Sequence, residues 1–131
     1  MIAAGNINIT RVERSKLKDI NLTNIPFGKY FTDHMLEVDF EDGEWKNAEI
    51  KPYQPLLLEP SLAALHYGQA IFEGIKAYKN EAGAVSIFRP HDNFKRFNAS
   101  AERMQMPQVP EELFMEGMRM LVELDKNWIP Q

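Results

Sequence analysis

One arginine is the clearest starting point for chemistry in this 131-residue chain. Arg96 shares a helical spacing with Asn93, Ser100 and Arg103, which lie at offsets of 0, 3, 7 and 10 counted from Asn93. On a helix these offsets place the four side chains in one polar stripe. A planar guanidinium binds a phosphate or a carboxylate through two parallel hydrogen bonds. The stripe therefore indicates an anion site at Arg96, and a solvated helix face is the alternative that the spacing leaves open.

Aromatic residues and glycines in the segment Leu65–Tyr78 could complete such a site. Tyr67 and Phe72 flank Gly68, and a second glycine follows Phe72 two residues later. Aromatic side chains can form the walls of a ligand pocket, and glycine allows the backbone to approach a ligand closely. Together with the arginine, this segment suggests a small anionic ligand.

Other side chains give weaker chemical signals. The loop Ile25–Met35 gathers aromatics, Phe27 among them, around Gly28, and from the residue types alone we interpret it as a loop packed by its own aromatics. The three histidines share no metal-ligand spacing, and the chain has no cysteine. No serine lies in a nucleophile-elbow context. The sequence thus predicts no metal site and no serine or thiol nucleophile.

Composition excludes several classes of protein. Hydrophobic residues make up 44% of the chain and charged residues 26%, as in an ordinary globular domain long enough to bury a core. The net charge is -4 and no basic stripe is present, which argues against a nucleic-acid partner. No run approaches the roughly 18 apolar residues of a membrane span. Residues 1–10 lack the basic and apolar regions of a secretory signal, so we expect a cytoplasmic protein.

Two neighbouring elements must position the candidate site. Pro90 suits the first position of a helix, which we predict from Pro90 to about Gln105. Before it, Ala70–Lys79 and Val85–Phe88 read as two strands joined by a turn. The arginine would then lie on a helix that directly follows a hairpin.

The rest of the chain predicts the body of the fold. Leu36–Phe40 alternates apolar and acidic residues, Asp42-Gly43 supplies a turn with positive φ, and Trp45–Tyr53 returns as a second strand. Another helix begins after Pro110. Hairpins followed by helices indicate an α+β fold, in which an antiparallel sheet of hairpin-connected strands packs against helices.

Three long motifs resemble the branched-chain amino-acid aminotransferases, fold-type IV enzymes that use pyridoxal 5'-phosphate. The motifs are FGKYFTDHM at 27–35, LHYGQAIFEGIKAY at 65–78 and FRPHDNFKRFNASAERM at 88–104. The tail LVELDKNWIP at 121–130 is also similar to the end of the small N-terminal domain of that family. The resemblance implies that residues 1–131 are a single domain, the N-terminal small domain of a two-domain enzyme.

The resemblance also implies roles for individual residues. Arg96 matches the arginine that binds the phosphate of the cofactor, and Tyr67 and Phe72 match aromatics of the substrate side-chain pocket. Phe27 matches a further pocket phenylalanine, which replaces our reading of its loop as self-packed. The family transfers an amino group between leucine, isoleucine or valine and 2-oxoglutarate, and it works as a homodimer whose subunits complete each other's pocket.

One departure from the family is large. The catalytic lysine and most cofactor contacts belong to the C-terminal domain, and no lysine of this chain, Lys76 included, matches the catalytic one. We therefore expect no catalytic residue in this chain, weak or no cofactor binding, and no transamination by the chain alone. Exposed interdomain surface should also give the isolated chain a tendency to associate.

Two alternatives stay open at this point. The chain could be a non-catalytic binding or dimerisation module that retains the fold for its interface. It could instead belong to another enzyme of the same fold type, a D-amino-acid aminotransferase or an aminodeoxychorismate lyase.

Overall fold

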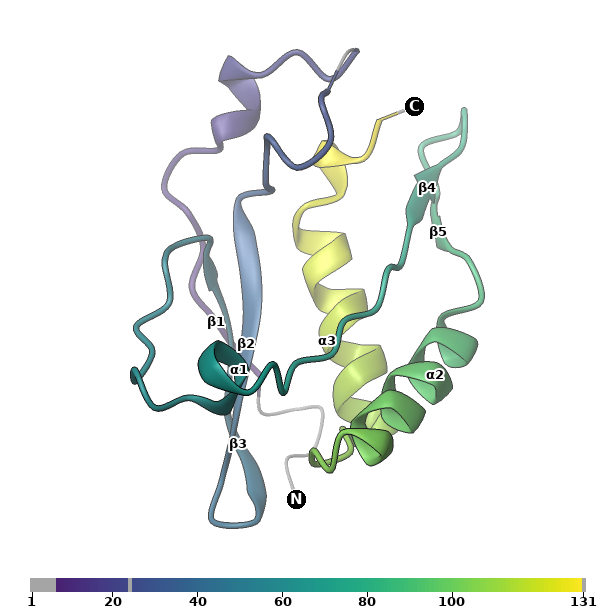
Figure 1. The fold of residues 1–131 in the computed structure, drawn as a ribbon. Helices are drawn as coiled ribbons and strands as arrows, with labels where there is room; N and C mark the ends of the chain where they lie inside the picture. Colours follow the sequence, from purple (N-terminus) through teal and green to yellow (C-terminus); the bar gives the residue numbers. More distant parts are fainter. Residues whose placement is uncertain (1–6, 24, 131) are drawn as a thin grey trace.

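The computed structural model describes residues 7–23 and 25–130 (Figure 1). The absence of a secretory signal was predicted from residues 1–10, and residues 1–6 lie outside the described part of the chain. The elements, in chain order, are β1 (Asn8–Ile9), the 3-10 helix η2 (Lys16–Asp19), β2 (His34–Glu41), β3 (Glu44–Pro52), α1 (Ala63–His66), β4 (Ala77–Lys79), β5 (Val85–Ile87), α2 (Pro90–Arg103), α3 (Glu111–Leu124) and the 3-10 helix η3 (Lys126–Trp128).

The predicted hairpin is confirmed as the antiparallel pair β2–β3, which runs from His34 opposite Pro52 to Glu41 opposite Glu44. Asp42 and Gly43 both have positive φ, at 53° and 81°, as a two-residue turn matched to the strand twist requires. The alternation of the strands and the turn signal together therefore predicted this hairpin.

The outer strand β1 adds a feature that the hairpin pattern did not indicate. It pairs with β3 in parallel, Asn8 with Glu49 and Ile9 with Ile50, so the sheet order is β1-β3-β2. The sheet is thus antiparallel apart from this short parallel edge.

Helix α3 covers one face of the three-stranded sheet, and the core lies between them (Figure 1). Ile50 is fully buried, and Ala48 and Leu113 are each 2% exposed. Gly117 lets the helix approach closely, because a Cβ at this position would lie 2.6 Å from Cδ2 of Leu36. Sheet, helices and core together confirm the predicted α+β class.

Helix α2 packs on α3 through aromatic rings. Phe94 and Phe97 of α2 lie 5.5 and 5.7 Å, centroid to centroid, from Phe114 of α3. The connection between the helices is fixed by Asn98, whose amide exchanges two hydrogen bonds with the backbone of Val109, at 2.8 and 2.9 Å. The helix that carries Arg96 is therefore anchored to the core.

The prediction of one strand over Ala70–Lys79 was wrong for most of its length. Only Ala77–Lys79 forms a strand, β4, which pairs with β5. Residues 70–76 form no ladder within the described part of the chain. After β5, Arg89, with φ of 48° and ψ of 50°, turns the chain into α2, so that a helix and not a further strand lies beside Gly74.

A buried pair, His34 and Asp125, joins the start of β2 to the end of α3. The Asp125 carboxylate accepts hydrogen bonds from the His34 backbone N–H at 3.0 Å and from His34 Nδ1 at 2.7 Å. Val12 donates its backbone N–H to His34 Nε2 at 3.1 Å. Because Nε2 is an acceptor here, the ring proton is on Nδ1 and the imidazole is neutral.

The neighbouring carboxylate of Asp33 is also buried and fully engaged. It accepts hydrogen bonds from the Ser15 hydroxyl, from Lys16 N–H at 2.9 Å and from Trp128 Nε1 at 2.9 Å. Burial raises the pKa of Asp33, but the hydrogen bonds from Ser15, Trp128 and Lys16 outweigh it and hold the pKa below its ordinary value. These contacts attach residues 12–16 to the start of β2, where it meets the end of α3. No helix in residues 7–23 and 25–130 is long and apolar enough to cross a membrane.

Candidate functional site

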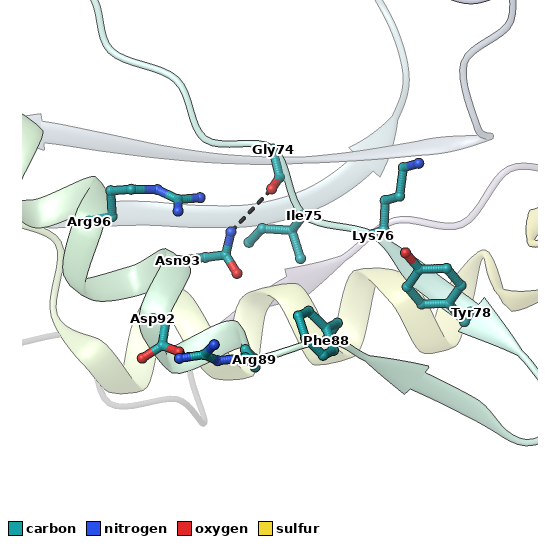
Figure 2. Close-up of a pocket in the computed structure, with 9 residues that line it drawn as sticks. All are labelled: Gly74, Ile75, Lys76, Tyr78, Phe88, Arg89, Asp92, Asn93 and Arg96. Atoms are coloured by element: carbon teal, nitrogen blue, oxygen red, sulfur yellow. Dashed lines mark hydrogen bonds and ion pairs between the residues drawn. The ribbon is translucent and has the colours of Figure 1, made fainter.

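A pocket of about 390 Å³ lies where α2 meets the segment that precedes β4 (Figure 2). Residues from four places line it: the extended segment, strand β4, the junction after β5, and the first two turns of α2. The lining residues are Gly74, Ile75, Lys76, Tyr78, Phe88, Arg89, Asp92, Asn93 and Arg96. The pocket therefore includes the arginine that the sequence singled out.

Arg96 is held by a carboxylate from the extended segment. Its Nε donates to Glu73 Oε1 at 2.8 Å and its Nη2 donates to Glu73 Oε2 at 2.6 Å. Asn93, one turn earlier on α2, donates its amide to Glu73 Oε2 at 2.6 Å and to the Gly74 carbonyl at 3.1 Å, and Figure 2 shows the second contact. The helical spacing of Asn93 and Arg96 thus directs both side chains onto one carboxylate.

The ion pair perturbs both of its members. Hydrogen bonds from Arg96, and then from Asn93, lower the pKa of Glu73. The same carboxylate raises the pKa of Arg96. The Glu73 side chain is 11% exposed, whereas that of Arg96 is 66% exposed. Both groups are charged at neutral pH, and the arginine is the member that faces solvent.

The guanidinium retains donors beyond those that Glu73 uses. A guanidinium has five N–H groups. Glu73 engages the Nε–Nη2 edge, and the other edge, formed by Nη1 and Nη2, makes no bidentate pair with a described residue, on a side chain that is 66% exposed. A second oxyanion fits this edge by the same bidentate geometry. The role of Arg96 in binding a phosphate stays a prediction, and the geometry favours it.

The structure does not bring the predicted aromatic residues to Arg96. Phe27 lies in a turn before β2, Tyr67 follows α1 as its C-terminal cap, and Phe72 lies in the extended segment. All three are exposed, at 107%, 85% and 91%. None of them lines the pocket that contains Arg96. Their role in a substrate pocket stays a prediction.

Sequence reasoning missed Glu73. Successive residues of an extended segment point to opposite sides, which places Glu73 and Phe72 on different faces. A usable signal was present, because Glu73 is the only acidic residue in the motif at 65–78 and carboxylates are the usual bidentate partners of arginine. In the ranges that the structure describes, no three histidine or acidic side chains are arranged to hold a metal ion.

Comparisons with known proteins give one consistent family. No family model matches the chain. The chain is 51% identical over 110 residues to branched-chain-amino-acid transaminase 1 of Bacillus subtilis (strain 168). This aligned stretch covers 83% of this chain and 31% of the relative. It is 45% identical over 126 residues to a probable branched-chain-amino-acid aminotransferase of Staphylococcus aureus (strain N315), covering 95% of this chain and 35% of the relative. It is 48% identical over 110 residues to the branched-chain-amino-acid aminotransferase of Mycolicibacterium smegmatis, covering 83% of this chain and 30% of the relative. The chain thus spans about a third of the length of the curated relatives that it matches.

Proposed function

Because this chain corresponds to a part of a branched-chain-amino-acid aminotransferase, we propose that it forms the N-terminal small domain of such an enzyme. The complete enzyme would transfer an amino group between leucine, isoleucine or valine and 2-oxoglutarate, with glutamate and the branched 2-oxo acids as the other partners. We place it in the cytoplasm, as a homodimer that acts in branched-chain amino-acid metabolism.

The observation that supports this function most directly is the bidentate ion pair between Arg96 and Glu73. The guanidinium already holds one carboxylate in a bidentate pair and presents its second edge to the outside. A dianionic phosphate group fits that edge, so the residues present agree with pyridoxal 5'-phosphate as the cofactor. When bound, the cofactor supplies the electron sink that amino transfer requires. Arg96 would hold its phosphate from the small domain.

The three exposed aromatics are suited to form the walls of the substrate pocket. Phe27, Tyr67 and Phe72 carry large apolar surfaces that the described part of the chain leaves uncovered. As walls of a substrate pocket they would cover a branched aliphatic side chain and exclude water from it. One methylene in such a pocket is worth about 1–3 kcal/mol, so the three branched substrates should overlap. The chain supplies pocket walls and a phosphate contact, and alone it is inactive.

Two proteins test this proposal. The 131-residue chain should show no leucine-dependent amination of 2-oxoglutarate above the background of free pyridoxal 5'-phosphate. A chimera, in which the matched residues of this chain replace those of the Bacillus subtilis relative, should show this activity, because the two are 51% identical across the exchanged part. Turnover by the chain alone, or a folded chimera that neither binds the cofactor nor turns over, would contradict the proposal.

Substitutions in the chimera test the phosphate contact. Arg96→Ala should weaken the binding of pyridoxal 5'-phosphate and leave the binding of pyridoxal, which has no phosphate, unchanged. Arg103→Ala is the matched control, because Arg103 lies on the same helical stripe and is absent from the pocket between α2 and the segment before β4, whereas a second, open hollow along α2 is lined by both arginines. Equal effects of the two substitutions would support the solvated-face interpretation of the stripe instead.

A further inference from the structure

Glu73 is the more buried member of its ion pair with Arg96. The Glu73 carboxylate receives three hydrogen bonds, two from Arg96 and one from Asn93, and its side chain is 11% exposed. Asn93 also holds the backbone of the next residue through the Gly74 carbonyl. One amide therefore fixes both the carboxylate and the segment that carries it against α2.

Two contacts on one edge define the plane of the guanidinium. A single hydrogen bond would let the group rotate about the contact, whereas the pair at Nε and Nη2 allows one orientation. The arginine side chain is 66% exposed, so little else in the described chain restrains it. Since binding is stronger when the donor groups are already ordered, a guanidinium held in this way should bind an anion more tightly than a mobile one.

The charge of Glu73 acts in the opposite direction. A carboxylate beside the guanidinium neutralises it and repels a second anion at close range. Glu73 could thus be a competitor that occupies the arginine when no ligand is bound. The two interpretations give opposite signs for the effect of removing the charge while the shape of the side chain is kept.

We propose that Glu73, held by Asn93, is a positioning residue that orients Arg96 so that its outer edge receives the phosphate of the cofactor. This inference rests on the proposed function, because it concerns the same arginine. It adds two residues to the phosphate site, neither of which touches the phosphate.

The test uses the chimera without bound cofactor, titrated with pyridoxal 5'-phosphate and, separately, with pyridoxal. Glu73→Gln should weaken binding of the phosphorylated compound about tenfold, which corresponds to the lower end of what a hydrogen bond to a charged group contributes. Binding of pyridoxal should not change. Asn93→Ala should weaken phosphate-dependent binding in the same direction by a smaller factor. Inorganic phosphate should compete less well with the cofactor in the Glu73→Gln variant.

Glu116→Gln is a control of the same chemistry. Glu116 forms a bidentate pair with Arg119 on α3, in which Arg119 Nε donates to Glu116 Oε2 at 2.8 Å. Neither residue lines the pocket around Arg96. This substitution should leave both affinities unchanged. Circular dichroism and the unfolding temperature of each variant show whether it is folded, so that a loss of affinity can be assigned to the site.

The outcomes separate the inference from the proposed function. Weaker phosphate-dependent binding in both Arg96→Ala and Glu73→Gln supports the inference. A loss in Arg96→Ala with unchanged or tighter binding in Glu73→Gln would overturn the positioning role and leave the phosphate contact intact. No effect of Arg96→Ala would overturn both.

Discussion

The buried pair of His34 and Asp125 should be among the most sensitive points of the domain. Their side chains are 5% and 7% exposed, and the carboxylate accepts two hydrogen bonds from His34. Asp125→Ala leaves a buried backbone N–H and a buried ring N–H without an acceptor. Each hydrogen bond to a charged group contributes about 1.5–3 kcal/mol, so we expect the free energy of unfolding to fall by about 3 kcal/mol or more. That is a large part of the roughly 5–15 kcal/mol that holds a typical domain together.

Asp125→Asn sharpens the argument because it keeps the shape of the side chain. The two N–H groups of His34 require two acceptors, and an amide offers one acceptor and one donor. The ring cannot accept at Nδ1 instead, since its other nitrogen already accepts from Val12. We therefore expect Asp125→Asn to cost about 2 kcal/mol, because one N–H of His34 then faces another donor.

The assay is equilibrium unfolding of the 131-residue chain in urea, followed by circular dichroism. Asp19→Ala serves as the control, because Asp19 forms an exposed ion pair with Arg14, with side chains 68% and 70% exposed. Exposed pairs contribute about 0–1 kcal/mol, so this variant should unfold almost as the parent does. If the free energy of unfolding falls by less than about 1 kcal/mol in both Asp125 variants, the cost that we assign to buried N–H groups without an acceptor is wrong.

Three further substitutions test other parts of the structure. Gly117→Ala should destabilise the chain by about 1 kcal/mol, because a Cβ placed 2.6 Å from Leu36 Cδ2 forces repacking that exceeds the gain in helix propensity; urea unfolding at neutral pH measures it, and a stabilised variant would show that the sheet yields easily. Gln105→Gly should stabilise by about 0.5–1 kcal/mol, because Gln105 has φ of 55° at the end of α2, where glycine carries no steric cost; an unchanged melting temperature would contradict this. The pKa of Asp33 is lowered from 3.8, so its contribution to stability is complete above that pH and is lost as the pH falls through the lower folded-state value. The difference in unfolding free energy between the parent and Asp33→Asn should therefore shrink from pH 7 toward pH 2, and a constant difference would refute the linkage.

Features with local causes were predictable from the sequence. The hairpin turn at Asp42-Gly43 is encoded by two adjacent residues, and the start of α2 by Pro90, so both lie where expected. The strand predicted over Ala70–Lys79 had the right local alternation, but a strand also requires a neighbour. Whether a neighbour exists depends on the path of the chain after Phe88, which no local pattern encodes.

The candidate site was likewise predictable only where its features have local causes. The spacing of Asn93 and Arg96 identified the helix face and the chemistry of the guanidinium. Its partner Glu73 lies 23 residues away from Arg96, and only the packing of the extended segment on α2 brings them together. The roles of Tyr67 and Phe72 depend on what covers these exposed side chains, so the described chain by itself does not define a substrate pocket.

The polar network at the end of the domain also constrains the order of events during synthesis. His34 and Asp33 meet Asp125 and Trp128 across 91 and 95 residues of sequence. Until residues 125–128 have left the ribosome, the buried imidazole has no carboxylate and Asp33 has only its early partners near Ser15. Closing so long a loop is entropically costly, so these bonds should form late in folding. The β2–β3 hairpin can pair much earlier on the nascent chain, whereas its first residue, His34, is bonded to Asp125 only after the end of α3 has been synthesised.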